Sequence, residues 1–93
     1  MPEIEIAHIH EQGQDMIIAP LNSSFGAKPS NEQQATIAAI QRAAMGAGLR
    51  GRVVAVWQSG SSFSFIAPQQ WHAFFRSIDM NWVLANINRK LTW

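Results

Sequence analysis

The chain has 93 residues, of which 47% are hydrophobic and only 14% are charged, and its formal net charge at pH 7 is +1. This length suits one domain with one core, so we expect residues 1–93 to form a single domain without a deep, enclosed active site. The lack of cysteine excludes disulfides, thiolate metal sites and cysteine nucleophiles.

The N-terminal residues also restrict the class of protein. Glu3 and Glu5 lie where a signal peptide would have basic and then apolar residues. No apolar run approaches the roughly 20 residues that span a bilayer. We therefore expect a cytoplasmic protein with no membrane partner.

Charge is distributed unevenly along the chain. Residues 1–41 have a net charge of −4 and residues 42–93 have a net charge of +5. The six basic residues of the second half are too few for a strong nucleic-acid footprint, so we do not favour nucleic acid as a partner. Low charge together with four Trp, five Phe and four Met is typical of protein interfaces and favours a homo-oligomer.

The first two predicted elements are strands. Residues 3–11 alternate between polar and apolar side chains, and residues 16–21 form a second apolar run. Gln12-Gly13-Gln14 supplies the glycine of a hairpin loop between them. In the register with a three-residue loop, His10 pairs with Met16.

A loop and a helix follow. Residues 22–29 consist of turn-forming residues around Phe25, for which the sequence suggests no role. Ser30 and Gln33 have the spacing of a capping box, and the helix that they begin should end near residues 46–47. Its narrow apolar stripe consists of Ile37, Ile40 and Ala44.

The next predicted elements are two further strands, at residues 52–58 and 63–67, joined by a Ser-Gly-Ser-Ser turn. In the simplest register, one face of this pair carries Val54, Val56, Phe63 and Phe65. The other face is also apolar. Helices on one side of the sheet and a second subunit on the other would account for this.

Two helices complete the prediction. Pro68 suits the first turn of a helix with a stripe of Trp71, Phe74, Phe75 and Ile78. Asp79 should cap a last helix, whose stripe consists of Met80, Val83, Leu84, Ile87 and Leu91. The order ββαββαα indicates an α+β fold: a mainly antiparallel four-stranded sheet with helices packed on one face, and strands two and three parallel.

The last predicted helix carries a second row of side chains off its apolar stripe. Trp82, Asn86, Arg89 and Trp93 follow one another at i, i+4, i+7 and i+11, and Lys90 lies beside them. Such a ridge is able to stack on nucleic-acid bases or a small planar ligand, or to form the centre of a protein interface. Alternatively, the two indoles simply cover the core.

Gln69, His72 and Arg76 line one edge of the preceding predicted helix. They would either face a cleft, with His72 as an acid or base, or form the solvated shoulder of an amphipathic helix. We favour the shoulder.

His8 and His10 are separated by one residue, so a strand points both imidazoles to the same side. Two histidines with a third, such as His72, are a possible metal site of a small metal-dependent enzyme. A single His-x-His is weak support for a metal, and we favour the interpretation that these are two half-exposed histidines at the polar end of a strand.

No other motif indicates an enzyme or a cofactor. The interpretation that we favour is a small non-enzymatic binding or assembly module that self-associates. The alternatives are nucleic-acid or planar-ligand binding through the Trp/Arg ridge, and a metal-dependent enzyme built on His8 and His10.

Overall fold

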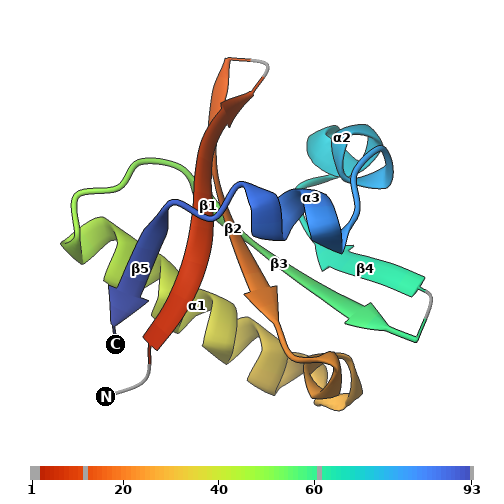
Figure 1. Cartoon of the computed structure of the whole chain (residues 1–93). Helices are drawn as coiled ribbons and strands as arrows, with labels where there is room; N and C mark the ends of the chain where they lie inside the picture. Colours follow the sequence, from red (N-terminus) through yellow and green to blue (C-terminus); the bar gives the residue numbers. More distant parts are fainter. Residues whose placement is uncertain (1–2, 12, 61, 93) are drawn as a thin grey trace.

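The computed structural model describes residues 3–11, 13–60 and 62–92, which form an α+β domain (Figure 1). One mixed sheet has the strand order β4-β3-β2-β1-β5. Its strands are β1 (Glu3–Glu11), β2 (Gln14–Leu21), β3 (Arg52–Ser59), β4 (Ser62–Ile66) and β5 (Arg89–Thr92). The helices are α1 (Ser30–Gly46), α2 (His72–Arg76) and α3 (Met80–Ala85), with 3-10 turns η1 (Ser23–Ala27) and η2 (Gln69–Trp71).

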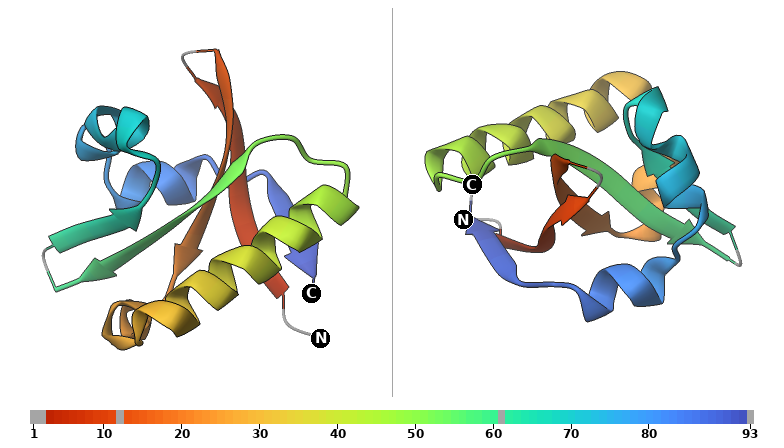
Figure 2. Two further views of the ribbon diagram at one scale, coloured as in Figure 1. Left: turned by 180° about the vertical axis from the view of Figure 1, so that it is seen from behind. Right: turned by 90° about the horizontal axis from the view of Figure 1, so that it is seen from above.

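Helices cover both faces of the sheet, so the prediction that they pack on one face is wrong. Figure 2 shows α1 on one side and the segment containing α2 and α3 on the other. The central strands β2 and β3 provide apolar side chains for the packing of helices on both faces, because successive side chains of a strand point to opposite faces. Met16 and Ile18 are buried on one face, and Ile17 and Ala19 on the other.

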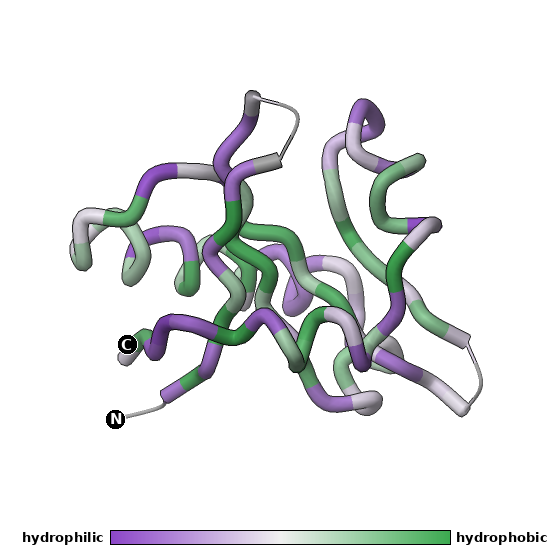
Figure 3. Tube along the Cα trace, turned by 45° about the horizontal axis from the view of Figure 1, so that its top comes forward, coloured by the Kyte–Doolittle hydropathy of each residue, from purple (hydrophilic) through white to green (hydrophobic). Residues whose placement is uncertain are grey.

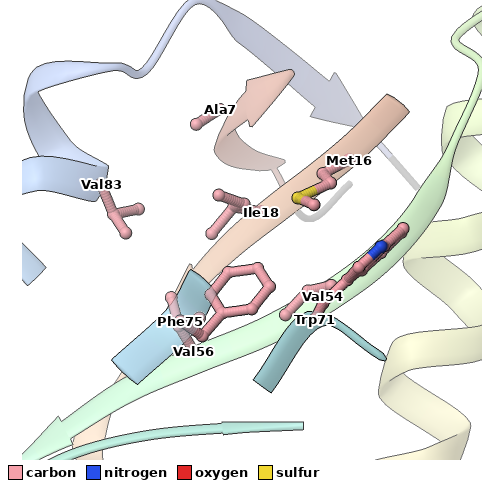
Figure 4. Close-up of a cluster of buried hydrophobic side chains, with 8 residues drawn as sticks. All are labelled: Ala7, Met16, Ile18, Val54, Val56, Trp71, Phe75 and Val83. Carbon is pink, nitrogen blue, oxygen red and sulfur yellow. The ribbon is translucent and has the colours of Figure 1, made fainter. Parts of the chain in front are cut away.

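The larger core cluster lies between the sheet and the α2–α3 side (Figure 4). Its stripe residues Trp71 and Phe75 are 4% and 0% exposed, as the helical spacing predicts. Partly buried Phe74 and Ile78 pack around them. The buried members of this cluster are Ala7, Met16, Ile18, Val54, Val56, Trp71, Phe75 and Val83.

The second cluster lies between the sheet and α1. Ile40 and Ala44 of the predicted helical stripe are fully buried, and Ile37 packs against them. The buried members are Ile6, Ile17, Ala19, Ile40, Ala44, Val53 and Leu91. Both apolar faces of the sheet are therefore covered from within one chain.

The C-terminal segment corrects the predicted element order. Asp79 caps α3 as expected, since its Oδ1 accepts from Trp82 N at 2.9 Å. The helix ends at Ala85, however, and residues 89–92 form the fifth strand, antiparallel to β1. The order is ββαββααβ, and Leu91 is buried against α1 from a strand rather than a helix.

Strand pairing confirms one predicted relation and corrects another. β2 and β3 are parallel, as the helical crossover predicts, while β3 and β4 are antiparallel. The β1–β2 pairing is shifted by one residue from the predicted register, because Glu11 pairs with Gln14 and not with Asp15. His10 therefore faces Asp15 rather than Met16.

The segment between β2 and α1 gives Phe25 its role. Phe25 is 3% exposed and packs edge-on against Trp57 with ring centroids 5.2 Å apart. Ser30 is the first residue of α1 and not its cap, because the N-cap position is Pro29, which makes no side-chain hydrogen bond. Gln33 does not complete a capping box but donates from Nε2 to the Phe25 carbonyl oxygen at 3.0 Å.

None of the helices in the described ranges has the length and hydropathy needed to cross a membrane.

Candidate functional site

The predicted C-terminal ridge is divided between two elements. Trp82 is half-buried in α3 and packs edge-on against Phe74 at 5.7 Å, so this indole covers the core. Arg89 and Lys90 lie in β5, where neighbouring side chains project to opposite faces of the sheet. Asn86 donates from Nδ2 to the Trp82 carbonyl oxygen at 2.7 Å. Trp93 lies outside the described residues, and a binding role of the set stays a prediction.

The second predicted patch lies on η2 and α2. His72 Nε2 is 3.0 Å from the Ala67 carbonyl oxygen, which only accepts, so this nitrogen donates. The same ring packs edge-on against Phe65 at 5.3 Å. These contacts tie His72 to the segment before η2, while Gln69 and Arg76 are exposed. The arrangement suits the predicted solvated shoulder.

His8 and His10 lie near the polar end of the β1–β2 hairpin, whose hydrophilic tip extends from the apolar body of the sheet (Figure 3). His10 Nδ1 is 2.7 Å from Asp15 Oδ1 on the facing strand. His8 Nε2 is 2.8 Å from the carbonyl oxygen of Arg50, in the loop before β3. Within residues 3–11, 13–60 and 62–92, no three His, Asp or Glu side chains gather to hold a metal ion.

Asp15 is the charged centre of this hairpin end. The hydrogen bond from His10 holds the pKa of the Asp15 carboxyl below its ordinary value, and the nearby charges of His8 and Arg50 act in the same direction. Burial opposes this shift but does not cancel it. Asp15 therefore remains a carboxylate over a wider pH range than a free aspartate.

Gly51 lets the loop before β3 approach this centre. Its φ is +119°, and a Cβ added to it would lie 2.6 Å from the Asp15 carbonyl oxygen. Only glycine combines that backbone conformation with so close a contact. No local pattern in the sequence indicates this close approach, because it depends on the parallel register of β2 and β3.

Two open cavities adjoin at Arg52 and Pro68. One, of about 430 Å³, lies beside α1 and is lined by Gln34 and Gln41; the other, of about 410 Å³, reaches Trp71. Both volumes fall within the usual range for small-ligand pockets. The residues that line them come from segments far apart in the sequence, so no local motif could have indicated them.

The outer edge of β4 is a third candidate. In the described part of the chain no other strand pairs with this edge (Figure 1). None of the residues Ser62–Ile66 is charged, and Phe63, Phe65 and Ile66 are only half-buried. The opposite border of the sheet, β5, carries the exposed residues Arg89 and Lys90. Charges on an edge strand oppose pairing with another chain, so β5 is protected and β4 is not.

Ser59 pairs with Ser62, two residues separate them in the sequence, and this pairing decides which backbone groups β4 presents. A loop of this length is closed by a hydrogen-bonded pair, and such pairs alternate along an antiparallel ladder. Ser62 and Ser64 therefore direct their backbone groups to β3, and Phe63 and Phe65 direct theirs outward. Such an edge is able to accept another strand.

The chain was compared with protein-family models, with curated proteins and with solved structures, and none of the three comparisons finds a match.

Proposed function

We propose that this protein is a small assembly module that self-associates by pairing β4 with β4 of a second copy. The observation that carries the proposal is the contrast between the two borders of the sheet. An uncharged, half-buried strand forms one border, and a strand with two cationic side chains forms the other. The first border has the properties that sheet proteins ordinarily avoid on an unpaired edge.

The segment Phe63-Ser64-Phe65 reads the same in both directions, which suits a two-fold axis at Ser64. An antiparallel pair about that axis places Phe63 opposite Phe65 of the second copy. These residues are the ones that direct their backbone groups outward, so they would exchange hydrogen bonds across the axis. Residues of both copies contribute equally, as a two-fold interface requires.

Among the residues that the structure describes, the faces of the sheet offer no comparable surface. α1 covers one face, and α2 with α3 covers the other. The exposed large hydrophobic side chains of the described residues are Met45 and Leu84, which are 68% and 55% exposed. They belong to different helices on opposite faces of the sheet and do not form a patch. Strand pairing therefore accounts for self-association better than contact between faces.

Charge substitution at the axis tests the proposal. Two Ser64 residues would form a non-hydrogen-bonded pair, in which side chains lie closest. Ser64→Lys places two like charges opposite each other and should weaken self-association about tenfold or more, as should Ser64→Glu. Mixing these two variants should restore a dimer with one copy of each. Sedimentation equilibrium measures association, and native mass spectrometry identifies the mixed dimer.

Thr92→Lys provides the matched control, because it adds the same charge to the exposed face of β5. Its dissociation constant should equal that of the unmodified protein, and circular dichroism should show all three variants folded. A wild-type monomer at high micromolar concentration would refute the proposal. So would Lys and Glu variants that associate as well as the wild type.

A further inference from the structure

The side chains of His8 and His10 lie on the same face of the sheet, and both are at least partly exposed to solvent. His8 pairs with Ile17 and His10 with Asp15, so both side chains lie on the side of the sheet that carries α1. Two residues of a strand rise by about 6.7 Å, a span that two imidazoles are able to close around one ion. His10 is 66% exposed as a side chain, and His8 is partly exposed.

Hydrogen bonds fix the tautomer of each ring. The Arg50 carbonyl oxygen only accepts, so His8 Nε2 carries the hydrogen and Nδ1 keeps its lone pair. Asp15 is ionised at neutral pH and also accepts, so His10 Nδ1 carries the hydrogen and Nε2 keeps its lone pair. In the neutral form of each ring, one nitrogen is thus available as a ligand, and none of the hydrogen bonds of the described residues occupies it.

These hydrogen bonds are compatible with histidines that bind a metal. Histidines that bind a metal ordinarily donate their other ring hydrogen to a carboxylate or a backbone carbonyl, which sets the ring orientation and increases its basicity. One ring here donates to a carboxylate and the other to a carbonyl. A ring hydrogen donated to a carbonyl is not specific to metal sites, because His72 makes the same contact with Ala67; His8 and His10 add to it a shared face of one strand.

We propose that the β1–β2 hairpin binds one late first-row divalent cation through His8 Nδ1 and His10 Nε2, with water in the remaining positions. Imidazole is a preferred ligand of Cu²⁺, Ni²⁺ and Zn²⁺, and Cu²⁺ binds a given site most tightly of these. Asp15 is a positioning residue that acts through His10. The inference goes beyond self-association, because β1 and the β4 edge are separated by two strands.

The charges around the hairpin end are mixed. The Asp15 carboxylate attracts a cation, and Arg50, which acts on the Asp15 carboxyl through its charge, repels one. Only two protein ligands come from the described residues, so the site should exchange its ion readily and not retain it through purification. The affinity must therefore be measured by titration and not by metal content.

Cu²⁺ titration of the untagged full chain tests the proposal, with calorimetry for affinity and electron paramagnetic resonance for ligands. We expect one Cu²⁺ per chain and a spectrum with two nitrogen ligands. His8→Ala and His10→Ala should each leave at most one of these nitrogens and weaken binding at least tenfold. The control His72→Ala should bind Cu²⁺ as the wild type does, because His72 lies on another element.

Asp15→Asn distinguishes a built site from two adventitious surface histidines. This variant removes the charge behind His10 without removing a ligand, and losing such a partner typically weakens metal binding about 10- to 100-fold. We expect weaker binding by about tenfold, with the two-nitrogen spectrum retained. An unchanged affinity in folded Asp15→Asn, or wild-type affinity in His8→Ala or His10→Ala, would overturn the proposal.

Discussion

At the scale of single residues, the contact between His10 and Asp15 makes the stability of the metal-free protein depend on pH. The hydrogen bond holds the Asp15 pKa below its ordinary value in the folded state. The stabilisation is therefore complete above the unfolded pKa of about 3.9 and is lost as the pH falls through the lower folded pKa. We expect wild-type unfolding free energy to fall across this window more steeply than that of Asp15→Asn.

NMR titration of the Asp15 carboxyl carbon measures the same effect directly. The midpoint should lie below the ordinary aspartate value in the wild type and move upward in His10→Ala, which lacks the largest cause of the shift. A midpoint that does not move in His10→Ala would show that the neighbouring charges, and not the hydrogen bond, lower this pKa.

The sequence shows that His8 and His10 share a face, but it does not show their partners. The face follows from residue spacing alone. The partner of His10 depends on the register of β1 and β2. The actual register differs by one residue from the predicted one and places Asp15, not Met16, opposite His10. The partner of His8 depends on Gly51, which brings the Arg50 carbonyl to His8 from a loop 42 residues away. Neither relation leaves a local signal.

At the scale of elements, two side-chain amides continue the sheet where a strand ends. Asn88 pairs with His8 through both amide atoms, at 2.8 Å each, just before β5 begins. Gln41 of α1 accepts from Val53 N at 2.9 Å and donates to the Gly51 carbonyl at 3.0 Å. The two amides thereby satisfy backbone groups of His8 in β1, of Val53 in β3 and of Gly51, the residue before β3.

Gln41→Ala should therefore destabilise the start of β3. Two hydrogen bonds, each with a net value of about 1 kcal/mol, are lost, and the expected cost is about 1–2 kcal/mol. Urea denaturation measures the cost, and hydrogen exchange at the Val53 amide should accelerate. Gln34→Ala is the control, since Gln34 is an exposed residue of α1 that lines the same cavity as Gln41. If both variants changed the unfolding free energy equally, the replacement of a helical glutamine by alanine, and not the loss of the Gln41 contacts with β3, would account for the change.

The last element shows where sequence patterns lose their meaning. Leu91 follows Ile87 at the i+4 spacing of a helix, but it also alternates with the exposed residues Lys90 and Thr92 as a strand requires. A short segment with one buried residue fits both periods, and pairing with β1 decides between them. The asparagines of the Asn86-Ile87-Asn88 segment, which favour turns over helix interiors, were the available signal for the helix end.

At the scale of the whole molecule, apolar residues on both sides of the strands have two possible explanations. They indicate either a sheet enclosed between helices or a sheet with one face against another subunit. The sequence places Trp71 and Phe75 on one apolar helical stripe and Ile40 and Ala44 on another. It does not show that these stripes pack against opposite faces of the sheet. The placement of the helices depends on contacts between residues that are far apart in the sequence.

The shared strands should make both layers unfold together. β2 and β3 contribute to each cluster, so loss of packing on one face reaches the other through the sheet. Phe75→Ala removes a fully buried ring from the α2 side and should cost about 3–5 kcal/mol, a large part of the roughly 5–15 kcal/mol of a typical domain. Native-state hydrogen exchange should show the same loss of protection at slowly exchanging amides of β3 and of α1, around Ile40.

Met45→Ala is the control for that experiment, because Met45 is 68% exposed and its truncation should change stability by less than about 0.5 kcal/mol. In Phe75→Ala, the amides of β3 could lose protection against exchange while those of α1 keep theirs. That result would contradict the unfolding of both layers as one cooperative unit. Equal losses would mean that the sheet couples its two covered faces, since its strands β2 and β3 contribute to both core clusters.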